Sequence, residues 1–160
     1  MKSTSFKSLL LGALLVSISV FNTGCIGDYI ENYTGYGTKN DEPNVPDSYQ
    51  GRPVDVQGTL YVNNKNVTFY VWDSGMIDGD IITLTVNGRE LISYFTLTGS
   101  KKSVSATLNK GYNYVLLYAH NEGDVSPNTA ALSVDDGSGE QEITLSANLS
   151  TNAAYNVVLN

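Results

Sequence analysis

Residues 71–88 have the sequence Val-Trp-Asp-Ser-Gly-Met-Ile-Asp-Gly-Asp-Ile-Ile-Thr-Leu-Thr-Val-Asn-Gly. Apolar and polar residues alternate from Ile82 to Val86, which is the period of a β-strand with one buried face. An acidic, glycine-containing loop precedes this strand, and Asn87-Gly88 follows it. The Asn-Gly pair favours the positive φ angles of a two-residue hairpin turn. The stretch therefore predicts the end of one strand, a long loop, a second strand and a tight turn.

The same alternation continues through the rest of the chain from Val54. Apolar residues at helical spacing are not found in any window, whereas β-branched and aromatic residues are frequent. Strands are expected at residues 56–62, 67–72, 81–87, 90–96, 103–108, 112–119, 129–135, 142–147 and 155–159. Eight or nine short strands separated by turn signals indicate an all-β fold, an antiparallel β-sandwich of the immunoglobulin-like or jelly-roll-like kind.

The charge balance of the chain bears on its partners. Lys and Arg together number 9 and Asp and Glu 16, so that the formal net charge of the 160 residues is −7. Recognition of nucleic-acid phosphates requires clustered basic residues, so nucleic acid is not an expected partner. An acidic surface attracts cations instead.

The N-terminal residues have the pattern of an export signal. Lys2 and Lys7 precede an apolar run that is too short to span a bilayer, and Cys25, the sole cysteine, follows it. The pattern resembles a bacterial lipoprotein signal, in which a small residue, here Gly24, precedes the cysteine that is lipidated. The alternative is ordinary secretion with a leftover thiol.

The lipoprotein interpretation divides the chain into three parts. Residues 1–24 would be the signal peptide, residues 25–53 a lipidated cysteine and flexible tether, and residues 54–160 the sandwich domain. Proline, glycine and polar residues without an apolar period are typical of a tether. Ile26 is not an acidic retention signal, so by analogy the expected location is the outer membrane.

The lengths of the connections divide the sandwich into two ends. If successive strands alternate in direction, the tight polar turns at residues 63–66, 87–89 and 109–111 fall at one end. The longer segments 73–80, 98–102, 120–128 and 148–154 fall at the other. Long loops on a rigid sandwich are where binding residues usually lie. We therefore expect a ligand site at the long-loop end.

Acidic and amide side chains are concentrated in two of these long loops. Ca²⁺ is bound by carboxylate, amide and carbonyl oxygens, often on loops that contain glycine. The candidate calcium ligands are Asp73, Asp78, Asp80, Asn121, Glu122 and Asp124. Turns also favour Asp, Asn and Gly for conformational reasons, and the sequence leaves both interpretations open.

A set of short motifs resembles a known group of proteins. These are Asp78-Gly79-Asp80, Asn87-Gly88, Tyr118-Ala119-His120-Asn121-Glu122-Gly123 and Pro127-Asn128-Thr129-Ala130-Ala131. In order and spacing they are similar to an uncharacterised β-sandwich module of secreted and lipid-anchored proteins in the Bacteroidetes. The resemblance implies a fold and a location at the cell envelope or cell surface, and assigns no activity.

Two aromatic residues next to the acidic loop suggest a second kind of ligand. Tyr70 and Trp72 fall on the same face of their strand. Aromatic rings beside a calcium ion would suit the stacking of a sugar ring, which would make the chain a carbohydrate-binding module. The simpler interpretation is that Trp72 covers the edge of the core beneath the loop.

The chain is not expected to be an enzyme. His120 is the only histidine, and there is no Gly-x-Ser-x-Gly nucleophile motif. We interpret His120 as an exposed loop residue. The sequence thus favours a non-catalytic binding or interaction module, with a carbohydrate-binding module and a structural subunit of an envelope complex as alternatives.

Overall fold

The computed structural model describes residues 45–160. The predicted signal peptide, Cys25 and the tether up to residue 44 lie outside the described residues. The regular elements of the described part are the strands β1 (Ser48–Tyr49), β2 (Arg52–Val62), β3 (Asn66–Trp72), β4 (Ile81–Val86), β5 (Arg89–Thr96), β6 (Lys102–Thr107), β7 (Gly111–Ala119), β8 (Asn128–Asp135), β9 (Glu140–Ala147) and β10 (Asn152–Leu159).

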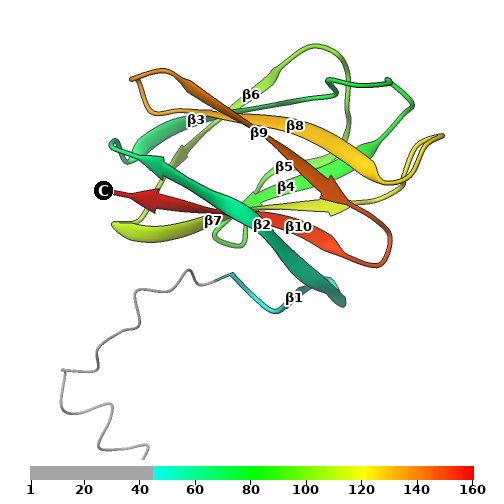
Figure 1. Cartoon of the computed structure of the whole chain (residues 1–160), viewed down its shortest axis with the longest axis horizontal. Coiled ribbons are helices and arrows are strands. Elements are labelled where there is room, and N and C mark those ends of the chain that lie inside the picture. Colours follow the sequence, from blue (N-terminus) through cyan, green and yellow to red (C-terminus); the bar gives the residue numbers. More distant parts are fainter. Residues whose placement is uncertain (1–44) are drawn as a thin grey trace, which may run out of the picture. The chain divides into compact units, whose positions relative to one another are not determined.

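These strands form two sheets packed face to face (Figure 1). The larger sheet has six strands in the order β1-β2-β10-β7-β4-β5, and the smaller has four in the order β6-β3-β8-β9. The predicted all-β sandwich is therefore confirmed. Across residues 45–160, a helix with the length and apolarity needed to cross a membrane is not found.

The domain begins earlier in the chain than Val54. The short strand β1 and the first two residues of β2, Arg52 and Pro53, fall in the segment that the sequence predicts as tether. Gln50 and Gly51 between them have φ values of 52° and 77°, and so make a tight hairpin turn. Asn152 holds this hairpin, because its side-chain amide donates to the backbone oxygen of Tyr49 at 2.8 Å.

One strand pair departs from the antiparallel expectation. β10 pairs with β2 in parallel, from Asn152 opposite Val54 to Leu159 opposite Val62. The main strands alternate in direction, so the first and the last of the nine run the same way. Because the number of alternating strands from β2 to β10 is odd, the ladder between these two strands is parallel.

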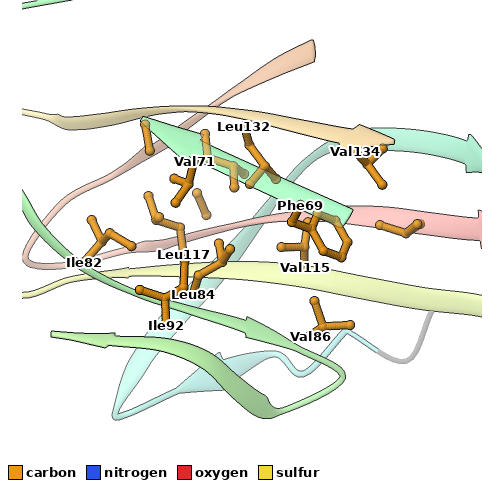
Figure 2. Close-up of a cluster of buried hydrophobic side chains, with 14 of the residues drawn as sticks. Phe69, Val71, Ile82, Leu84, Val86, Ile92, Val115, Leu117, Leu132 and Val134 are labelled. Atoms are coloured by element: carbon orange, nitrogen blue, oxygen red, sulfur yellow. The ribbon is translucent and has the colours of Figure 1, made fainter. Parts of the chain in front are cut away.

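The core lies between the two sheets and is built from the inward side chains of both (Figure 2). Phe69 and Val71 from β3 meet Ile82 and Leu84 from β4, and each is completely buried. Burial of side chains of this size stabilises the fold by about 1.5–3 kcal/mol each. The apolar residues of the period-two pattern thus face the core as predicted, but the strand is buried on both faces, because Thr83 and Thr85 are buried as well.

Side-chain amides make the tight-turn end rigid. The predicted Asn87-Gly88 turn has φ values of 51° and 78°, as a primed turn requires. The buried Asn113 accepts hydrogen bonds from the Asn87 side chain and the Asn109 backbone, both at 2.8 Å. This one side chain therefore fastens the β4–β5 turn to the β6–β7 turn.

Candidate functional site at the long-loop end

The long loops of the sandwich meet at one end and are hydrogen-bonded to one another. In Figure 1 the β3–β4, β7–β8 and β9–β10 loops lie on the right-hand side. The backbone N–H of Val125 donates to Oδ2 of Asp78 at 3.0 Å, which joins the first two of these loops. The N–H of Leu149 donates to Oε1 of Glu122 at 3.0 Å, which joins the second to the third.

The fourth long connection, between β5 and β6, is part of the same assembly. The backbone N–H of Asp73 donates to the carbonyl oxygen of Thr98 at 2.9 Å, and that of Leu97 to the carbonyl oxygen of Asp80 at 2.8 Å. The loop segments 73–80 and 120–128 therefore lie side by side, as the alternation of strand directions predicts.

Asn121 fixes the spacing between the loops. Its Oδ1 accepts the backbone N–H of Ile81 at 2.6 Å, and its Nδ2 donates to the carbonyl oxygen of Gly79 at 2.9 Å. Both polar groups of this side chain are thus used within the protein. Asn121 therefore joins the two loops through hydrogen bonds, and its side chain is not open to a calcium ion as predicted.

A hollow of about 220 Å³ opens between the two loops. Asp73, Asp78 and Asp80 line it from the β3–β4 loop, and the segment from Val125 to Thr129 lines it from the other side. Three of the six predicted calcium ligands are therefore brought to one place.

Asp80 is the most constrained of the three carboxylates. Its side chain is only 3% exposed, and Oδ2 accepts the backbone N–H of Thr129 at 3.1 Å. Its Oδ1 has no hydrogen-bond partner within residues 45–160, and the same holds for Oδ1 of Asp78. An unpaired buried acceptor costs free energy, so both oxygens are suited to a donor or a cation.

Burial is also the main reason why the pKa of Asp80 is raised from 3.8 to about 6. The Thr129 N–H opposes the shift, while the negative charges of Asp78, Asp73 and Glu122 add to it. Burial and like charges both disfavour the ionised carboxylate. The site therefore holds a charge that a bound cation would stabilise.

Gly123 allows the loops to approach so closely. Its φ is +54°, and a Cβ at this position would collide with the carboxylate of Asp78. The sequence shows a glycine after Glu122, but only the structure shows that this glycine faces the carboxylate of Asp78.

The remaining predicted ligands do not join the hollow. Glu122 accepts a hydrogen bond from the β9–β10 loop. Asp124 is exposed and is not among the residues that line the hollow. Within residues 45–160, a group of three His, Cys, Asp or Glu side chains that could hold a metal ion is not found. Any cation here would thus also need carbonyl oxygens and water as ligands.

Of the two aromatic residues predicted to stack on a sugar, Tyr70 is half-buried and Trp72 is buried. Trp72 is buried, and the ammonium group of Lys101 lies 4.4 Å from the centre of its ring and 5.6 Å from that of Tyr70. Lys101 in turn forms an ion pair with Glu140. Little of the Trp72 ring is therefore open for a sugar to stack on.

His120 differs from the exposed loop residue that the sequence suggested. Its ring is half-buried at the end of β7, with ring centres 4.5 Å from Tyr94 and 4.9 Å from Tyr118. Nε2 lies 2.9 Å from the hydroxyl of Thr83. Burial, reinforced by the charge of Arg52, lowers the pKa of His120.

The rim of the long-loop end carries large apolar side chains. Met76, Ile77, Val125 and Leu149 come from three different loops, and each is more than half exposed. Met76 and Val125 also line the hollow. Their position in polar loops is visible in the sequence, but the arrangement of these loops at one end is seen only in the structure.

Comparison of the chain with protein-family models, curated proteins and solved structures found no match. The resemblance to a Bacteroidetes module stays a prediction.

The raised pKa of Asp80 predicts a pH-dependent stability. A carboxyl with a raised folded-state pKa contributes stability that is present below pH 3.8 and is lost as the pH rises through 6. In EDTA, the unfolding free energy of Asp80→Asn relative to wild type should thus rise by about 1 kcal/mol from pH 5 to pH 7.5. Urea unfolding at both pH values measures it.

The lowered pKa of His120 has the opposite effect on stability, but His120 is present in both proteins and its contribution cancels in the comparison. A difference between the two proteins that does not change with pH would contradict the buried state of Asp80.

Proposed function

We propose that this chain is a lipid-anchored binding protein of the outer membrane, whose long-loop end docks a protein partner without catalysis. The observation that carries the proposal is the group of four exposed apolar side chains, Met76, Ile77, Val125 and Leu149, on loops that are tied together. Exposed apolar groups gathered at one place mark interaction sites more often than isolated ones do.

The surroundings of these side chains agree with an interface. Asp78, Glu122 and Asp124 stand around them and would form a polar rim, as apolar contact centres usually have. The hydrogen bonds between the loops hold the surface in one shape before binding. Pre-ordering reduces the conformational entropy lost on association.

A non-catalytic role is supported by the use made of the candidate reactive groups. His120 contacts two tyrosine rings and a threonine hydroxyl, and Asp80 accepts a backbone N–H. In the described part these two groups serve the packing of loops and strands. A nucleophile with its base requires a different arrangement.

We further propose that Ca²⁺ organises the hollow. The unpaired oxygens Oδ1 of Asp78 and Oδ1 of Asp80 fit a hard cation, which would complete its coordination with loop carbonyls and water. A bound cation would neutralise the charges that raise the pKa of Asp80, and would join the two loops more firmly.

The docking surface can be tested by site-specific photo-crosslinking in intact envelopes. A photoreactive amino acid in place of Ile77 or Val125 should give a discrete adduct with a protein, because these side chains would be buried in the complex. The same group in place of Lys110, exposed at the tight-turn end, is the control. Introduction of Leu149→Asp should reduce the adduct at least tenfold.

Adducts of equal strength from both ends, adducts with lipid alone, or no adduct would each overturn the docking proposal.

The calcium proposal predicts a change in melting temperature. A ligand that binds only the folded state at 100 times its Kd stabilises by about 2.7 kcal/mol. The melting temperature in millimolar calcium should exceed that in EDTA for the wild type and for Asp124→Asn, whose side chain is exposed. The increase should disappear in Asp80→Asn. Identical melting in calcium and EDTA would remove calcium from the proposal and leave the docking surface standing.

The anchor can be tested separately. Lipid chains on Cys25 would hold the protein in the membrane, and two or more chains are needed for stable attachment. Cys25→Ser should therefore move the protein from the membrane fraction to the soluble fraction, as followed by immunoblotting after carbonate washing. Retention of the variant in the membrane fraction would contradict lipid anchoring.

A further inference from the structure

A second recess lies on the outer face of the six-stranded sheet, away from the hollow between the loops. Thr83, Tyr118 and His120 line it from β4 and from the end of β7. Tyr49 and Gln50 line it from the β1–β2 hairpin, and Glu90 and Ser93 line it from β5. Its volume is about 190 Å³, enough for a small polar ring.

A bulge in β5 shapes one wall of this recess. Ile82 pairs with Phe95 and Leu84 with Ile92, so that Ser93 and Tyr94 together stand opposite the single residue Thr83. Such a bulge turns a side chain in a new direction and is frequent beside binding sites.

The bulge depends on an unusual backbone conformation. Tyr94 has a φ of +48°, a value rarely adopted by residues other than glycine, asparagine and aspartate. Its N–H donates to the Thr83 hydroxyl at 3.2 Å, which holds the turned conformation. The side chain is 67% exposed as a result. Strain retained to expose an aromatic ring is a reason to look for a ligand.

The exposed ring is part of a fixed aromatic row. His120 lies between Tyr94 and Tyr118, and Tyr118 is 6.0 Å from Tyr49 with the rings nearly perpendicular. The guanidinium of Arg52 covers Tyr118 at 4.2 Å. The row therefore leads from the hairpin to the bulge, with only Tyr94 at its outer end substantially free.

We propose that a neutral saccharide binds here, with one sugar ring resting on Tyr94, which packs against His120 beside the recess. The sugar hydroxyls would enter the recess and bond to Glu90, Ser93 and Gln50. A sugar ring has an apolar face of C–H groups, which suits an exposed aromatic plane, and hydroxyls that both donate and accept. The three polar side chains are exposed and supply a carboxylate, a hydroxyl and an amide.

The charged groups around the recess, one acidic and one basic, favour a neutral ligand over an ion. Glu90 disfavours an anion, and Nη1 of Arg52 already donates to the backbone oxygens of Ala119 at 2.7 Å and Asn148 at 3.3 Å. An organic cation would need several free ring faces around it. Arg52 already covers the ring of Tyr118, and His120 packs against Tyr94. Tyr94 therefore offers one open ring face, whereas an organic cation would need to be surrounded by several.

Affinity electrophoresis of the full chain in non-ionic detergent tests the proposal. The gels contain dextran, mannan, xylan, a mixed-linkage β-glucan or, as an anionic probe, polygalacturonate. We expect retardation by at least one neutral polysaccharide. Tyr94→Ala should weaken it at least tenfold, Glu90→Gln should weaken it less, and Tyr94→Phe should retain it.

Tyr61→Ala is the matched control, because Tyr61 is also an exposed strand tyrosine, 58% exposed on β2. This variant should be retarded like the wild type. Melting temperatures of all variants show whether each one is folded.

Four results would overturn the proposal: retardation by polygalacturonate alone, no retardation by any neutral probe, retardation that persists in folded Tyr94→Ala, or loss in Trp72→Ala but not in Tyr94→Ala. None of these results bears on docking or calcium at the long-loop end, which have separate variants.

Discussion

The buried carboxylate of Asp80 is the constraint around which the long-loop end is built. It stands where β4 begins, and its backbone and side chain hold the neighbouring connections through Leu97 and Thr129. Burial of a charged carboxylate lowers the stability of the fold unless each of its oxygens has a hydrogen-bond or ionic partner. One oxygen is paired by a backbone N–H and the other has no partner in the described part. Within residues 45–160, the loops are therefore ordered by a carboxylate that is only partly paired.

The connections between strands are stabilised differently at the two ends of the sandwich. At one end, Asn87 and Asn113 satisfy the backbone of short turns with amide groups, and little polar capacity is left over. At the other, Asp78, Glu122 and Asn121 also bond backbone groups, but between loops that are longer and bear apolar tips. The sheets supply rigidity to both, and the second end combines unpaired carboxylate oxygens with exposed apolar side chains.

Local patterns in the sequence predicted the parts of the structure that depend on local physics. Alternation identified the strands, and Asn87-Gly88 identified a primed turn, because these follow from side-chain period and from backbone sterics. The cover of Lys101 over Trp72 and the parallel pairing of β2 with β10 depend on residues far apart in the chain. Tyr94 could not be predicted either, since its positive φ opposes the ordinary preference of tyrosine.

The ladder between the first and last long strands has a consequence for how the domain is made. β2 emerges early from the ribosome, yet its partner β10 ends at Leu159, next to the last residue of the chain. A contact between such distant segments must close a long loop, which slows folding. The six-stranded sheet therefore cannot be completed before β10 has been synthesised. Until then, the two-residue strand β1 is the only neighbour of β2 in this sheet among residues 45–160.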